Sequence, residues 1–275
     1  MVMEISTRNQ YIIGTIIVVA LTVVGGVLYR QGAHKPGFNP QATSTEPATT
    51  TTFLSPTTMV VSGPSGSYTI TQLSASDQPT APAYKGTITC PSSMPQETCS
   101  AIESKDATII AMLDKNATDF SAWIELSAIH KQVGDNAGAE AIWTYLTKVY
   151  PTSPVAFNDL GDLYMNFMKE YSKAEANWLQ AIKLQPNDPA PYANLFALYT
   201  ETNYHPSATA GEAILKEGIA ANPKAVELQV LLARYYKAQG DSAQANAEYD
   251  AAIKNAQGQG LSSLAQQLAA EKAGQ

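Results

Sequence analysis

The stretch from Asn158 to Pro186 constrains the fold most, because its apolar residues recur at helical spacing in two blocks. A short polar turn at Lys169 and Glu170 separates the blocks. Two helices joined by so short a turn form a hairpin, and a lone hairpin can bury its apolar side only against a neighbouring one. The stretch therefore predicts one unit of a larger helical array.

The same marks recur along the chain at nearly constant spacing. Leucine fills one position four times, 34, 35 and 37 residues apart, at Leu126, Leu160, Leu195 and Leu232. A bulky residue of the second helix recurs after 35, 37 and 34 residues, at Trp143, Trp178, Leu215 and Tyr249. Proline closes three units, at Pro151, Pro186 and Pro223. This period predicts four helical hairpins over residues 117–256.

The order of residues within a unit resembles the tetratricopeptide-repeat (TPR) family, whose 34-residue units carry tyrosine, alanine and other aromatic positions between a leucine-glycine pair and a final proline. The resemblance rests on Leu160, Gly161, Tyr164, Tyr171, Ala174, Trp178, Ala181 and Pro186. The third unit departs from it, with Gly211 and Gly218 at the usual alanine positions. The resemblance implies an all-α solenoid of TPR-like hairpins over residues 100–275.

A flanking helix is expected at each end of the array, since the terminal units need a partner with a polar outer face. Cys99–Asn116 has apolar residues in helical phase, as do Leu261, Leu264 and Leu268. Asn116-Ala117-Thr118 also fits an N-glycosylation triplet, although we favour a role in capping the turn before the next helix.

Residues 1–8 form a short tail before an apolar segment at 9–29, which is uncharged and lies between Arg8 and Arg30. At about 1.5 Å per residue, such a helix spans roughly the 30 Å hydrocarbon layer of a bilayer. A cleaved signal peptide has a shorter apolar core and a small-residue cleavage site. We therefore expect an uncleaved transmembrane helix in contact with lipid, with a signal peptide as the alternative.

Residues 30–64 are rich in Thr, Ser and Pro and predict a disordered stalk. Residues 65–99 are expected to form a small β or irregular segment; the β-like runs are TMVVSG, just before it, SYTITQL and KGTITC. Cys90 and Cys99 are the only cysteines, and in an oxidising compartment they would close a disulfide loop. Stalks of this kind are typical of exported proteins. We expect a cytoplasmic N-terminus and repeats on the extracytoplasmic side, periplasmic or at the cell surface.

Charge and motifs narrow the function. Residues 101–275 carry 13 basic and 20 acidic side chains, hence the whole net charge of −7, which disfavours nucleic-acid binding. The sequence has no glycine-rich phosphate loop, no GxSxG and no cluster of metal-ligand residues, and its three histidines are scattered. We expect neither enzymatic activity nor a cofactor or metal.

In TPR proteins the first helix of each unit lines a concave groove that binds a protein or peptide. Carried over by the resemblance, this groove would include Ile124, Lys131, Asn158, Asp162, Asn166, Arg234 and Lys237. The asparagine amides could hold a peptide backbone, and Arg234 could hold a carboxylate. For each residue a solvated helix face is the alternative. We expect a membrane-anchored interaction scaffold or assembly factor, with a structural subunit of a larger surface or envelope assembly, including a homo-oligomer, as the alternative.

Overall fold

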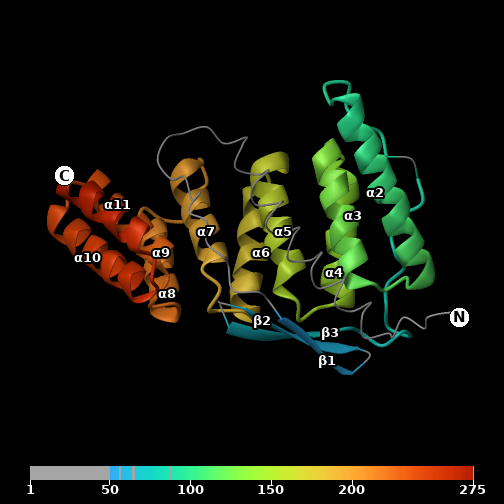
Figure 1. Ribbon diagram of the computed structural model, residues 1–275, viewed down its shortest axis with the longest axis horizontal. Coiled ribbons are helices and arrows are strands. Elements are labelled where there is room, and N and C mark those ends of the chain that lie inside the picture. The colour runs from blue at the N-terminus through green and yellow to red at the C-terminus, as the bar shows by residue number, and fades with distance from the viewer. Residues whose placement is uncertain (1–49, 56, 64–65, 87, 275) are drawn as a thin grey trace, which may run out of the picture. The chain divides into compact units, whose positions relative to one another are not determined.

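The structure, a computed structural model, describes residues 50–55, 57–63, 66–86 and 88–274 (Figure 1). The chain divides into two compact units after Leu163, so the described residues belong to a first unit over 50–163 and a second over 164–274. Helices make up most of both units. The all-α expectation for the C-terminal part of the chain is confirmed.

The first unit begins with a small antiparallel sheet in the order β1-β2-β3. Its strands are β1 (Thr50–Ser55), β2 (Thr58–Gly63) and β3 (Gly66–Thr71). Met59 lies opposite Ile70, and the side chain of Ile70 is only 1% exposed. Because alternate residues point to opposite faces of a sheet, Ile70 marks its buried face.

The sheet corrects part of the stalk prediction. Two of the three β-like runs are strands, since TMVVSG is β2 and SYTITQL contains most of β3, whereas KGTITC has no strand in its described residues. β2, however, lies inside the predicted stalk of residues 30–64, and so does β1. The threonines of β1 are β-branched and favour an extended backbone, and pairing with β2 supplies stabilisation that composition does not show.

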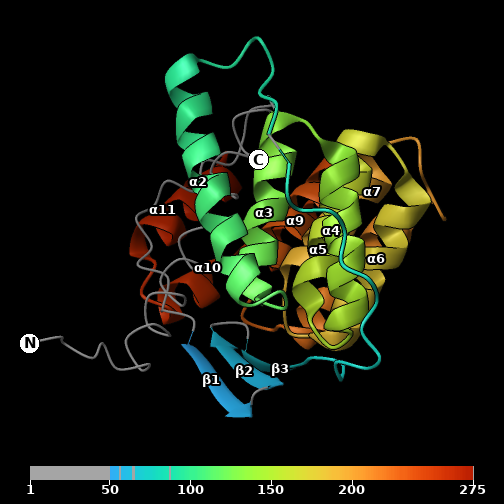
Figure 2. The same ribbon diagram turned by 90° about the vertical axis from the view of Figure 1, so that its right-hand side faces the viewer.

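An extended segment follows β3. Residues 72–95, here called the strap, contain neither helix nor strand among those described, and Figure 2 shows the strap running beside α3 and α4. Leu73 donates its backbone N–H to the carbonyl of Val149 at 2.8 Å. Further along, the ring of Tyr84 meets that of Trp123 edge to face, with centroids 5.4 Å apart. The strap thus ties the sheet to the helices of the first unit.

Four helices complete the first unit: α2 (Gln96–Lys115), α3 (Phe120–Val133), α4 (Asn136–Val149) and α5 (Pro154–Leu163). α3 and α4 form a hairpin whose turn begins at Gly134, in the left-handed conformation that glycine adopts without steric cost (φ 84°). Asp135 then accepts a hydrogen bond from Gly138 N at 2.9 Å and caps the start of α4. Trp123 and Trp143 are 0% and 3% exposed in the core.

The second unit continues the helical pairs. Its elements are a short π-helix, η1 (Tyr164–Met168), and the helices α6 (Tyr171–Leu184), α7 (Ala190–Glu201), α8 (Ala210–Ala221), α9 (Val226–Ala238), α10 (Ser242–Gly258) and α11 (Ser262–Ala273). Lys169 has a left-handed backbone (φ 58°) between η1 and α6, at the turn that the sequence predicts. The expected terminal helix is α11, and its Leu268 is 1% exposed in a core shared with α9 and α10.

The two glycines that depart from the TPR pattern have a packing reason, which is clearest at Gly218. A Cβ atom built on Gly218 would lie 2.7 Å from Cγ of Tyr192 and 2.8 Å from Cδ1 of Leu228. Real Cβ atoms do not approach other atoms so closely. The third hairpin therefore brings its helices nearer to each other than an alanine would allow.

The predicted tail at 1–8, the predicted membrane span at 9–29 and most of the predicted stalk lie outside the described residues. Within the part of the chain that the structure describes, none of the helices combines the length and the apolar content that crossing a bilayer requires.

Candidate protein-interaction surface

In the first unit, the predicted groove residues form a half-buried strip on the first helices of two successive hairpins. We use the term strip for Ile124 and Lys131 of α3 with Asn158 and Asp162 of α5. The Lys131 ammonium forms an ion pair with the Asp162 carboxylate and lies 5.9 Å from the centre of the Trp143 ring. This pair joins α3 to α5 across the strip.

Asp159 adds a second carboxylate beside the strip, which the sequence did not single out. Burial raises the pKa of Asp159 to about 7; nearby Lys131 lowers this pKa and Asp162 raises it. Next to it, Oδ1 of Asn158 is buried and has no hydrogen-bond partner among the residues that the structure describes. The spacing of Asp159 and Asp162, three residues apart on one helix, was the signal in the sequence. The strip thus offers an ion pair and an amide oxygen, and a carboxyl group whose pKa burial raises to about 7 lies beside it.

In the second unit, Arg234 already holds a carboxylate from its own chain. Its Nε and Nη2 donate to the two oxygens of Glu271 on α11 at 2.7 and 2.8 Å. Tyr249 of α10 donates its hydroxyl to the same group at 2.7 Å. The predicted contact of Arg234 with a partner's carboxylate therefore competes with an internal one, whereas Lys237, near the end of α9, has an exposed side chain, and Asn166 of η1 is half-buried.

Tyrosine-to-glutamate hydrogen bonds recur between successive helical pairs of the second unit. Tyr199 of α7 and Tyr204 each donate to the carboxylate of Glu175 on α6, at 2.6 Å. Tyr236 of α9 donates to Glu212 on α8 at 2.8 Å. These pairs were not predicted from the sequence, although Tyr199 and Glu175 both have a counterpart 37 residues later, at Tyr236 and Glu212. These carboxylates connect one hairpin to the next, so we assign them a structural role and not one in binding a ligand.

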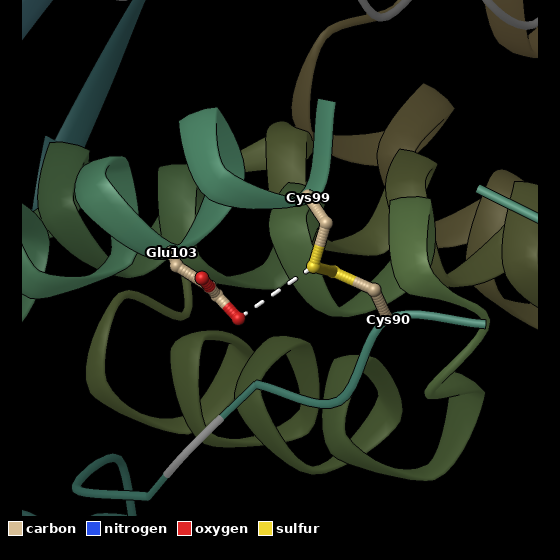
Figure 3. A group of neighbouring side chains, drawn as sticks. All are labelled: Cys90, Cys99 and Glu103. Carbon is tan, nitrogen blue, oxygen red and sulfur yellow. Dashed lines mark hydrogen bonds between the residues drawn. A yellow bond between two sulfur atoms is a disulfide. The ribbon is translucent and has the colours of Figure 1, made fainter. Parts of the chain in front are cut away.

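The two cysteines are joined. Cys90 of the strap and Cys99 of α2 form a disulfide, which attaches the end of the strap to the first turn of α2 (Figure 3). The carboxylate of Glu103 lies 3.6 Å from Sγ of Cys99. These three residues are close enough to hold a metal ion, but sulfur atoms in a disulfide provide no thiolate ligand.

One shallow depression of about 300 Å³ lies between the strap and α4. Pro79 and Pro82 line one side, and Ala141, Thr144 and Lys148 are among the residues on the other. The strap thus occupies part of the outer face of α4, leaving a depression with few groups suited to orienting a small ligand.

Comparison with known proteins gives similarities in fold only. The chain matches no family model and no curated protein. Among solved structures it is similar to MamA, with 15% identity over 63% of this chain and 99% of that chain and a TM-score of 0.47. It is also similar to Pseudomonas aeruginosa pilF, with 13% identity, a TM-score of 0.47, and coverage of 64% of this chain and 83% of that chain. A third similar structure is YrrB, "a TPR protein with an unusual peptide-binding site". It has 13% identity and a TM-score of 0.42, and the match covers 54% of this chain and 74% of that chain. These similarities are low, so the function has to be argued from the residues of this chain.

Proposed function

We propose that this protein is a non-catalytic interaction scaffold or assembly factor of the TPR type, whose first helices bind a protein or peptide partner. The strip carries the proposal. It lies on the first helices of two predicted hairpins, stays half-buried while other residues of these helices, such as Trp123 and Leu160, are packed in the core, and offers an apolar side chain, Ile124, beside charged and amide groups. A surface of this composition suits a polypeptide, which presents apolar side chains together with backbone donors and acceptors.

The proposal includes a membrane anchor at residues 9–29 with the repeats on the extracytoplasmic side. The uncharged apolar segment supports the anchor. The disulfide between Cys90 and Cys99 supports the location, because such bonds persist in oxidising compartments. In intact spheroplasts, added protease is expected to digest the repeats, and the two cysteines are expected to resist thiol labelling until they are reduced. Protected repeats with free thiols would place the domain in the cytosol.

Site-specific photo-cross-linking in native membranes tests the partner. A photoreactive phenylalanine analogue in place of Ile124 is expected to give an adduct of one defined mass. The matched control is Leu179, a 45% exposed side chain on the second helix α6, where we expect no adduct. Equal adducts at both positions, or none at Ile124, would contradict the proposal. Adducts that are multiples of the chain's own mass would favour a structural subunit instead.

A further inference from the structure

The turn between α2 and α3 carries the one Asn-X-Ser/Thr triplet of the sequence, Asn116-Ala117-Thr118. Asn116 directly follows α2 as its C-cap residue, and its side chain is exposed. Its Oδ1 accepts hydrogen bonds from the backbone N–H of Thr118 at 3.2 Å and from the Thr118 hydroxyl at 3.0 Å. We propose that Asn116 is an N-glycosylation site, with Nδ2 as the acceptor atom and the hydroxyl of Thr118 as the required group two residues on.

The corresponding turns of the later hairpins show why this side chain is accessible. The corresponding residues are Tyr150, Gln185 and Asn222, at successive intervals of 34, 35 and 37 residues from Asn116. Tyr150 is 2% exposed and donates its hydroxyl to the carbonyl of Thr118 in the preceding turn. Gln185 is 7% exposed. The side chains of Tyr150 and Gln185 are thus buried at this position, whereas that of Asn116, in the first of these turns, is exposed to solvent.

The side chain of Asn222, at the same position of a later turn, also makes contacts within the fold. Its Nδ2 donates to the carbonyl of Pro186 at 3.3 Å and to that of Gly218 at 3.2 Å. A sugar on this nitrogen would break both contacts. At Asn116 the hydrogen bonds of the turn use Oδ1, so a sugar on Nδ2 leaves them in place.

The backbone of the turn is held by groups that a glycan would not disturb. Nε1 of Trp123 donates to the carbonyl of Ala117 at 2.9 Å, and the backbone N–H of Asp119 donates to the carbonyl of Asn116 at 3.0 Å. These bonds involve carbonyl oxygens and not the Asn116 amide nitrogen. The folded turn can therefore carry a bulky, solvated glycan without rearrangement.

The donor belongs to the class of lipid-linked oligosaccharide phosphates, used by a membrane-bound transferase as the chain is exported. A bond forms between Nδ2 of Asn116 and the anomeric carbon of the sugar, while the bond from that carbon to the phosphate oxygen breaks. The proton from Nδ2 passes to a base of the transferase, and the lipid phosphate leaves. The inference rests on the proposed extracytoplasmic location of the repeats.

The experiment is translation of the full chain with microsomal membranes that contain an active oligosaccharyltransferase. The expected result is one band of lower mobility that peptide N-glycosidase removes. Asn116→Gln and Thr118→Ala should each abolish this band, whereas Thr118→Ser, which keeps a hydroxyl, should retain it. As a positive control, His205→Thr is placed in the Asn116→Gln chain, because it completes an acceptor triplet at the exposed Asn203.

The control separates two ways of failing. Modification at Asn203 without modification of the wild-type chain would overturn Asn116 as a site and leave the topology intact. Absence of modification at both would show that the repeats do not reach the lumen, which overturns the site and the proposed location together. Neither outcome bears on partner binding, which the cross-linking at Ile124 measures separately.

Discussion

Arg234 of α9 and Glu271 of α11 form a two-pronged ion pair, with N···O distances of 2.7 and 2.8 Å. The contact joins the last hairpin to the helix that closes the array. Because the fork of an arginine matches the two oxygens of a carboxylate, this pair fixes the orientation of α11 as well as its distance from α9. A residue that the TPR resemblance assigns to partner binding therefore has a structural role.

Replacing Glu271 should destabilise the second unit in a pH-dependent way. The pKa of the Glu271 carboxyl is lowered, mainly by its hydrogen bonds from Arg234. The pKa of Glu271 is therefore lower in the folded protein than in the unfolded chain. The stabilisation that its carboxylate provides is fully present above the unfolded pKa, about 4.3, and is lost as the pH falls through the folded pKa. Glu271→Gln should cost about 1 kcal/mol at neutral pH, allowing for partial solvent screening.

Urea unfolding of the full chain in detergent, at neutral pH and again at acidic pH, measures this loss. The control is Asp250→Asn, which removes the carboxylate paired with Lys272; the Asp250 side chain is 65% exposed. Exposed ion pairs contribute little, so this change should stay within about 0.5 kcal/mol. An equal loss for both variants at neutral pH would remove the special role of the Arg234 pair.

Trp178 tests the register of the repeats. Its side chain is 1% exposed at the recurrent bulky position of the second helix. Trp178→Ala should cost about 3–5 kcal/mol, as large-to-small changes at buried aromatic residues do. The adjacent Leu179 is 45% exposed, so Leu179→Ala should change stability by less than about 0.5 kcal/mol. If both variants unfold at the same urea concentration, the assignment of inner and outer faces on α6 is wrong.

The periodic features of the fold could be predicted from the sequence because they repeat. Leu126, Leu160, Leu195 and Leu232 all become buried in first helices. The partner of Arg234, by contrast, lies on another helix 37 residues away, and only the packing of α11 brings the two together. Likewise, the residue types at 158 and 159 do not reveal that Oδ1 of Asn158 is buried or that burial raises the pKa of Asp159. The strand β1 was missed because its stability comes from pairing with β2 and not from its own composition.

Gly218→Ala should destabilise the protein even though alanine is the better helix former. The added methyl group would meet Tyr192 and Leu228 at less than contact distance, and overpacking of this kind costs about 1–3 kcal/mol. Gly258 is the last residue of α10, and no heavy atom of the described residues, apart from its own helix backbone and chain neighbours, lies within 4 Å of the place that a Cβ atom would take there. Gly258→Ala should therefore be neutral or stabilise by up to about 1 kcal/mol. Thermal unfolding distinguishes the two, and a stabilised Gly218→Ala chain would contradict the close approach of α7 and α8.

Asp159 should make the stability of the first unit fall as pH rises. Burial raises its folded-state pKa to about 7, above an unfolded value of about 4. The folded protein therefore binds more protons between these values than the unfolded chain does, and the free energy of unfolding decreases with pH across this window. Asp159→Asn keeps the shape of the side chain and removes the charge. It should leave stability nearly unchanged near pH 4 and raise it near pH 8.

Asp162→Asn is the matched control for Asp159, three residues away on the same helix. Asp162 is paired with Lys131, so its replacement leaves a half-buried ammonium without this carboxylate and should lower stability at neutral pH. Urea unfolding of the two variants from pH 4 to pH 8 should thus give changes of opposite sign at the upper end of the range. Because Asp162 belongs to the strip and Asp159 lies beside it, the same titration can be followed in the cross-linking yield at Ile124. If Asp159→Asn leaves the pH dependence of stability unaltered, the Asp159 carboxylate is solvated in the folded protein. The part of α5 beside the strip would then be more open to solvent than the structure indicates.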